Sequence, residues 1–97
     1  MGGEKKELLM FYGNRCPMTK KADLIRVKVE EKLQTTITRL EVYESEENLQ
    51  RYKDVGGLQH CGGVPFFYNT ETESSVCGVG EEAIITAGAT LSSTKRF

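Results

Sequence analysis

The segment from residue 8 to residue 19, LLMFYGNRCPMT, is the feature that most constrains how this chain can fold. Its first five residues are all apolar or aromatic, which is typical of a strand buried on both faces. A short turn then leads to Cys16 and Pro17, and proline fits the first position of a helix. The thiol therefore lies where a strand passes into a helix, a position whose dipole favours a reactive thiolate. The alternative is an inert, buried cysteine at the same junction.

The length of 97 residues predicts a single domain over residues 1–97, with residues 1–6 and 92–97 as frayed tails. A formal net charge of −1 gives no general attraction to nucleic acid or to an anionic membrane. No apolar run approaches the length of a membrane span, and the first residues lack the apolar centre of a signal peptide. We therefore expect neither a nucleic-acid nor a membrane partner, and we expect a monomer.

Three cysteines without regular spacing argue against a disulfide framework of the secreted type. The sequence predicts residence in the cytoplasm or another reducing intracellular compartment.

Apolar periodicity and turn residues predict the element order β-α-β-α-β-β-α. Strands are expected at residues 7–12, 35–43, 64–68 and 74–79, and helices at residues 17–33, 46–55 and 81–93. The first two strands should be parallel, because a right-handed helical crossover joins them, and the last two should form an antiparallel hairpin. The predicted fold class is α/β: a mixed four-stranded sheet flanked by three helices, with helices on both faces.

Pro65 opens the aromatic run Phe66-Phe67-Tyr68. A proline is tolerated at the first residue of a strand, where its missing N–H breaks no central ladder bond. A proline in this place after a loop is a candidate for a cis peptide bond.

Three motifs in this order resemble glutaredoxins of the thioredoxin superfamily: Cys16-Pro17-Met18-Thr19, Val64-Pro65, and residues 76–82 with their glycines followed by Glu81 and Glu82. The resemblance spans about residues 8–89. It implies a thioredoxin-like fold in which a cis-proline loop faces the active cysteine, Cys16. It also implies glutathione as co-substrate with no bound cofactor. The substrate or glutathione-binding residues that the resemblance implies are Arg15, Thr19, Val64, Pro65, Gly78 and Val79.

Two positions depart from the glutaredoxin pattern. Thr19 stands where dithiol members have a second cysteine, so the resemblance implies a monothiol route. Its hydroxyl could bond a sulfur or cap the helix. Gly13 stands where glutaredoxins usually carry a lysine for the glutathione carboxylate, and Arg15 could substitute for that lysine.

The other two cysteines have separate interpretations. Cys61 lies in the loop before Val64 and is either a resolving thiol or an ordinary loop residue. Cys77 lies at a strand end, where core packing is the default. A zinc site built from His60, Cys61 and Cys77 lacks paired ligand spacing, so no metal is expected.

Two classes of function remain open. One is a monothiol, glutathione-linked thiol–disulfide oxidoreductase with Cys16 as nucleophile, acting on glutathione or on a protein disulfide or thiol partner. The other is a non-catalytic thioredoxin-fold module that binds a protein through the edge at Val64 and Pro65, or acts as a scaffold. Iron–sulfur cluster binding is a weaker variant of the first class, since its typical Cys-Gly-Phe-Ser motif is absent.

Overall fold

The protein is described here by a computed structural model, which covers residues 6–91. Of the tails expected at residues 1–6 and 92–97, all residues but Lys6 lie outside the described residues. Lys6 was expected to belong to the first tail, but its ammonium lies 3.7 Å from the Glu71 carboxylate.

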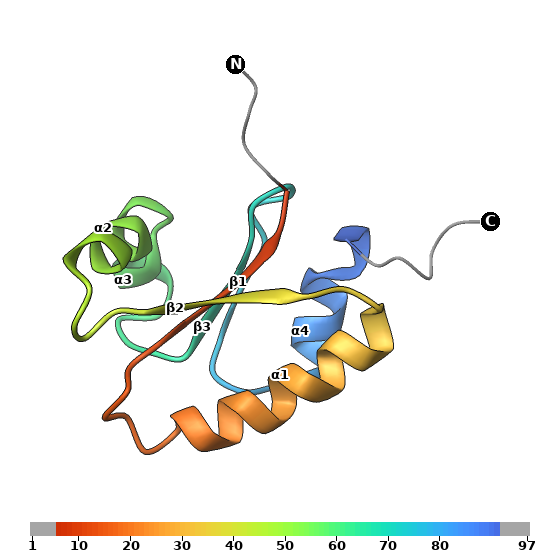
Figure 1. Cartoon of the computed structure of the whole chain (residues 1–97). Coiled ribbons are helices and arrows are strands. Elements are labelled where there is room, and N and C mark those ends of the chain that lie inside the picture. The colour runs from red at the N-terminus through yellow and green to blue at the C-terminus, as the bar shows by residue number, and fades with distance from the viewer. Residues whose placement is uncertain (1–5, 92–97) are drawn as a thin grey trace.

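Four strands form one mixed sheet in the order β2-β1-β3-β4 (Figure 1). Strand β1 (Leu8–Tyr12) pairs in parallel with β2 (Ile37–Glu41) and antiparallel with β3 (Phe66–Asn69). Strand β4 (Ser75–Cys77) pairs antiparallel with β3 at the edge. This arrangement confirms the predicted parallel pair, the terminal hairpin and the mixed four-stranded sheet.

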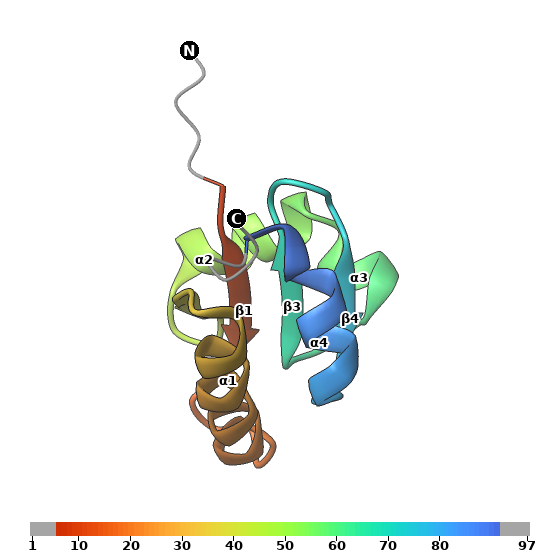
Figure 2. The same ribbon diagram turned by 90° about the vertical axis from the view of Figure 1, so that its right-hand side faces the viewer.

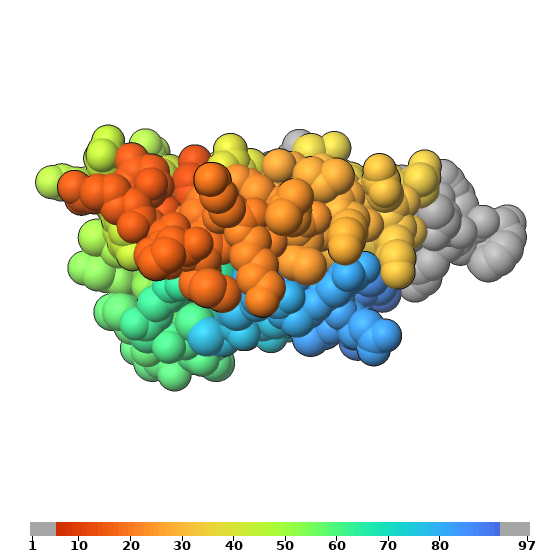
Figure 3. Space-filling view, turned by 90° about the horizontal axis from the view of Figure 1, so that it is seen from below, coloured from red at the N-terminus to blue at the C-terminus, as the bar shows by residue number. Residues whose placement is uncertain are grey.

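Helices cover both faces of the sheet, as predicted. Helix α1 (Thr19–Leu33) and helix α4 (Glu81–Ala87) lie side by side on one face, and a 3₁₀ turn, η1, follows at Ala89–Leu91 (Figures 2 and 3). Helices α2 (Glu46–Asp54) and α3 (Gly57–His60) lie on the opposite side of the sheet (Figure 1).

The alternation of side chains along β1 divides the core into two layers. Leu8 and Met10 pack with α1 and α4, whereas Leu9 and Phe11 pack toward α2. All four side chains are at most 1% exposed, which explains why β1 is a continuous apolar run. The strand that leads to Cys16 is thus the centre of the molecule.

Several element ends differ from the prediction by a few residues; α1, for example, begins at Thr19 and not at residue 17, so Pro17 lies in the turn before the helix. Two differences are larger. Residues 57–60 form the short helix α3 within a stretch that was expected to be a loop. The last helix ends at Ala87 instead of residue 93, because Gly88 stops it and lies directly against the core. A Cβ at Gly88 would lie 2.8 Å from Leu8 Cδ2 and 3.0 Å from Leu33 Cδ1.

Candidate functional site

The Gly13 carbonyl oxygen organises the loop that carries Cys16. It accepts a hydrogen bond from the Cys16 N–H at 3.0 Å and another from the Thr19 hydroxyl at 2.6 Å. The Thr19 N–H then donates to the Cys16 carbonyl oxygen at 3.0 Å. These three bonds close a compact turn, so the half-buried Cys16 side chain has a defined position just before α1.

Thr19 has neither of the roles that the sequence suggested. Helix α1 begins at Thr19, its N-cap residue is Met18, and no side chain caps it. The Thr19 hydroxyl instead bonds to the Gly13 carbonyl, because the turn at Pro17 and Met18 brings residue 19 back over residue 13. Thr19 is therefore a positioning residue for the cysteine loop.

The thiol of Cys16 faces the loop that precedes β3. Cys16 Sγ lies 3.9 Å from the Val64 carbonyl oxygen, and the Val64–Pro65 peptide bond is cis. Two segments 48 residues apart thus meet at the sulfur. No described residue accepts a hydrogen bond from the Val64 N–H, so this donor can serve a ligand.

The turn after β4 lies next to Pro65. The resemblance implied that Gly78 helps to bind glutathione, but its N–H donates to the Pro65 carbonyl oxygen at 3.0 Å and is not free for a ligand. The Val79 N–H has no hydrogen-bond partner within residues 6–91. Gly78 has a φ of 103°, and a Cβ there would meet open space. The turn therefore leaves the Val79 N–H available to a ligand, and no side chain at Gly78 stands in the way of that ligand.

The Tyr43 ring fills the space beside Gly13. A Cβ at Gly13 would collide with three ring carbons of Tyr43, so any side chain there, including the lysine usual in glutaredoxins, would require this ring to move. The same ring lies under the Arg15 guanidinium, with Arg15 Cζ 5.9 Å from its centroid. The positive charge at this side of Cys16 is thus supplied by Arg15 and is held by Tyr43.

The Glu41 carboxylate binds the backbone of the two segments that carry Arg15 and Tyr43. It accepts hydrogen bonds from the N–H groups of Asn14 at 3.0 Å, Tyr43 at 3.0 Å and Glu44 at 2.8 Å. Burial alone would raise the pKa of Glu41, but these backbone donors and the charge of Arg15 outweigh it and lower the pKa. The Glu41 carboxylate is therefore ionised at neutral pH.

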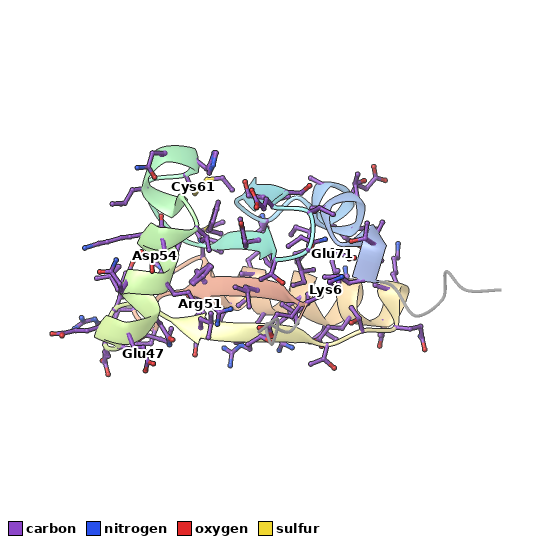
Figure 4. The ribbon with its side chains drawn as sticks, turned by 90° about the horizontal axis from the view of Figure 1, so that it is seen from above. Lys6, Glu47, Arg51, Asp54, Cys61 and Glu71 are labelled. Atoms are coloured by element: carbon purple, nitrogen blue, oxygen red, sulfur yellow. A yellow bond between two sulfur atoms is a disulfide. The ribbon has the colours of Figure 1, made fainter. Side chains whose placement is uncertain are left out.

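Cys61 and Cys77 form a disulfide, which replaces the expected roles of both residues (Figure 4). Cys77 pairs with Phe66 in the β3–β4 ladder, and α3 carries Cys61 to the same edge, with 5.3 Å between the two Cα atoms. That separation suits a disulfide. In this state Cys61 is not a resolving thiol, and Cys16 is the one free cysteine.

Residues 6–91 contain no group of three His, Cys, Asp or Glu side chains that could hold a metal ion. Within the same residues, no helix combines the length and the apolar character needed to cross a membrane.

A cavity of about 440 Å³ opens beside the cysteine loop. Its floor includes Val42 and Tyr52, which are buried. The Tyr52 hydroxyl donates to the Gly63 carbonyl oxygen at 2.6 Å, and burial raises the pKa of Tyr52, so the donor persists at neutral pH. The complete lining is Arg15, Val42, Tyr43, Leu49, Tyr52, Leu58, Gly62, Gly63 and Val64.

Comparison with known proteins shows a similarity of fold and none of sequence family. No protein-family model matches the chain, and no curated protein matches it in sequence. Among solved structures, the glutaredoxin grx-1 of Archaeoglobus fulgidus is similar, with a TM-score of 0.59 and 19% identity over 89% of this chain and 97% of that one. The fold of this protein is thus thioredoxin-like and similar to that of a glutaredoxin.

The sequence analysis missed Tyr43, Leu58 and the pairing of Cys77. Gly13 was a signal for Tyr43, since a glycine in place of a usual lysine suggests that another side chain occupies that space. The odd number of cysteines concealed the disulfide, because one free thiol and one pair also make three.

Proposed function

We propose that the protein is a monothiol, glutathione-linked thiol–disulfide oxidoreductase in which Cys16 is the nucleophile. The observation that supports this most is the position of Cys16 Sγ, 3.9 Å from the Val64 carbonyl oxygen and opposite the cis peptide bond. Cys16 is also the one cysteine that is free to react.

The reaction consists of two exchange steps. The Cys16 thiolate attacks the glutathione sulfur of a mixed disulfide, forms a Cys16–glutathione disulfide and releases the substrate as a thiolate. A second glutathione thiolate then attacks that disulfide, forms oxidised glutathione and releases the Cys16 thiolate. In sum, the mixed disulfide and one free glutathione become the substrate thiol and oxidised glutathione; the free glutathione is the reductant, and the glutathione of the mixed disulfide stays in a disulfide throughout.

Backbone donors fit the glutathione half of the substrate. The unpaired Val64 N–H would pair with the cysteinyl residue, as in strand addition to an exposed edge. The Val79 N–H would bind a glutathione carboxylate, and Arg15 adds positive charge beside Cys16. Gly63 and Gly78 both face open space, so no side chain of theirs blocks the ligand.

A glutathione-coupled assay with a small mixed disulfide tests the proposal. We expect Cys16→Ser to abolish turnover. The matched control is the double variant Cys61→Ser/Cys77→Ser, which should retain most of it below its unfolding temperature.

The same assay distinguishes the alternative, a non-catalytic binding module. If the wild-type protein shows no turnover, and Cys16→Ser binds a protein partner as well as wild type, the module interpretation replaces the enzyme. If the double variant alone loses turnover while folded, the Cys61–Cys77 pair takes part in the reaction and the monothiol route is wrong.

A further inference from the structure

The Cys61–Cys77 disulfide joins the two segments that carry the unpaired backbone amides of the site. Cys61 comes shortly before Val64 in the chain, and Cys77 comes shortly before Val79. The N–H groups of Val64 and Val79 are the donors that the proposed function assigns to glutathione. The disulfide is therefore a covalent bond between the two halves of that binding surface, although neither cysteine belongs to it.

The Pro65 carbonyl oxygen lies between the two segments. It accepts the Gly78 N–H at 3.0 Å, and Cys61 Sγ lies 4.0 Å from the same oxygen. The disulfide thus lies directly beside the hydrogen bond that holds the turn of Val79 against the loop of Val64. A change in the disulfide acts on both ligand amides at once.

Both segments are short and are followed by glycine. Helix α3 has 4 residues, and an isolated helix of that length is not stable in water. Gly62 and Gly63, which connect it to Val64, are exposed. Strand β4 has 3 residues, lies at the edge of the sheet and leads into Gly78, whose φ is 103°. Segments of this kind open locally at a small cost in free energy, so a bond between them restricts the motion of both.

The loop of Cys16 is held independently of the disulfide. The Cys16 N–H and the Thr19 hydroxyl both donate to the Gly13 carbonyl oxygen. On the other side of the sulfur, the Tyr52 hydroxyl donates to the Gly63 carbonyl oxygen at 2.6 Å. Opening the disulfide should therefore leave the thiol of Cys16 in place and loosen the glutathione amides only.

The disulfide is accessible to thiols in solution. Cys77 is exposed and Cys61 is half-buried, and Figure 4 shows Cys61 at the outer edge of the fold. Buried structural disulfides resist reduction by glutathione, whereas exposed disulfides are the labile and regulatory ones. The position of this disulfide is that of a bond which opens and closes with the redox state of its surroundings.

We propose that Cys61 and Cys77 form a redox switch that sets the affinity of the protein for glutathione, with tight binding in the disulfide state and weak binding in the dithiol state. This inference rests on the proposed function and adds its regulation. Because Cys16 is held independently, the switch changes affinity and leaves turnover at saturating substrate unaltered.

Oxidised glutathione, the product of the proposed reaction, is the oxidant that closes the switch. The Cys77 thiolate attacks one sulfur of oxidised glutathione, forms a Cys77–glutathione disulfide and releases one glutathione thiolate. The Cys61 thiolate then attacks Cys77 Sγ, closes the protein disulfide and releases the second glutathione. The protein dithiol loses two electrons and two protons, and oxidised glutathione becomes two molecules of glutathione. Affinity thus rises under the conditions in which glutathione disulfides accumulate.

Binding of S-methylglutathione, which has neither a thiol nor a disulfide to exchange, tests the switch. Titration calorimetry compares the oxidised protein with protein reduced by a phosphine. We expect Kd to be about fivefold higher after reduction, the size of effect that ordering one or two further side chains on binding produces. The matched control is Cys61→Ser/Cys77→Ser, which should have the Kd of the reduced protein and should not respond to the phosphine.

The alkylation rate of Cys16, followed in its own peptide by mass spectrometry, distinguishes a local change from a general loosening of the fold. We expect this rate to be the same in the oxidised and the reduced protein. A rate that rises in parallel with Kd would show that reduction disturbs the whole molecule, and it would overturn the switch.

A redox titration tests the lability of the pair. The Cys16→Ser variant is used, so that glutathione bonded to Cys16 does not add to the mass, and it is equilibrated in buffers of reduced and oxidised glutathione that span cytosolic and endoplasmic-reticulum ratios. Acid quenching and maleimide labelling should show the pair changing from dithiol to disulfide within this range. A disulfide that persists in the most reducing buffer is a structural bond and overturns the switch.

Failure of the switch and failure of the proposed function give different results. An equal Kd for the oxidised and the reduced protein would overturn the switch, while reduction of a small glutathione mixed disulfide would still support the oxidoreductase. If neither form binds S-methylglutathione and neither reduces the mixed disulfide, the glutathione-linked function itself is wrong.

Discussion

The Tyr43 ring occupies the space that a side chain at Gly13 would need, and it holds the Arg15 guanidinium on its face, 5.9 Å from the ring centroid. The Tyr43 ring therefore accounts both for the glycine at position 13 and for the position of the Arg15 charge beside Cys16. With the ring in this position, position 13 has no room for a side chain.

Gly13→Ala should displace the Tyr43 ring from Arg15. Tyr43 is 47% exposed, so its ring can move, and the cost in unfolding free energy should stay at or below about 1 kcal/mol. The ring-current shift of the Arg15 side-chain resonances should disappear in the NMR spectrum. Gly63→Ala, where the added Cβ meets nothing within 4 Å, should retain that shift.

Gly88→Ala should be more destabilising than Gly13→Ala. The added Cβ would press on Leu8 and Leu33, which are 1% and 4% exposed and cannot move into solvent. Overpacking of this kind typically costs about 1–3 kcal/mol. Denaturant unfolding of Gly88→Ala and Gly63→Ala measures the difference, and equal midpoints would contradict the packing argument.

Cys16 should be the one cysteine that iodoacetamide labels in the oxidised protein, because Cys61 and Cys77 are bonded to each other. Peptide mapping by mass spectrometry before and after reduction checks this. Labelling of Cys61 or Cys77 before reduction would show that the pair is open in solution.

Loss of the disulfide should lower the free energy of unfolding by about 3 kcal/mol, the chain-entropy value for a loop of this length. The two cysteines are 16 residues apart in the sequence. Urea unfolding of Cys61→Ser/Cys77→Ser, compared with oxidised and reduced wild type, provides the measurement. The double variant and the reduced protein should behave alike.

Glu41 should make stability depend on pH in the acid range. Its pKa in the folded protein lies below the ordinary value of 4.5, so its contribution is complete above that value and is lost as the pH falls through the folded pKa. Glu41→Gln should be less stable than wild type at pH 7, and the difference should shrink toward pH 3. A difference that is constant with pH would show that the charge of Glu41 does not matter.

Much of the fold could be predicted because local patterns and burial agree. The apolar run of β1 required burial on both faces, and this strand lies at the centre of the sheet between β2 and β3. Ser45 is a residue type favoured just before a helix, and it caps α2: its hydroxyl accepts the Asn48 N–H at 3.2 Å. The end of α4 was predicted less well, because Gly88 stops that helix where it contacts the core residues Leu8 and Leu33.

The candidate site, like the fold, could be predicted only in part. The sequence by itself determined that Cys16 lies between a central strand and a helix, and that Pro65 opens the strand beside it, since both follow from residues adjacent in the chain. Only the tertiary structure decided that Thr19 bonds to Gly13, that Cys61 pairs with Cys77, and that the Tyr43 ring excludes a side chain at Gly13. The pairing and the exclusion depend on the packing of segments far apart in the sequence, and the Thr19 bond depends on how the cysteine loop turns, which no local pattern of residues specifies.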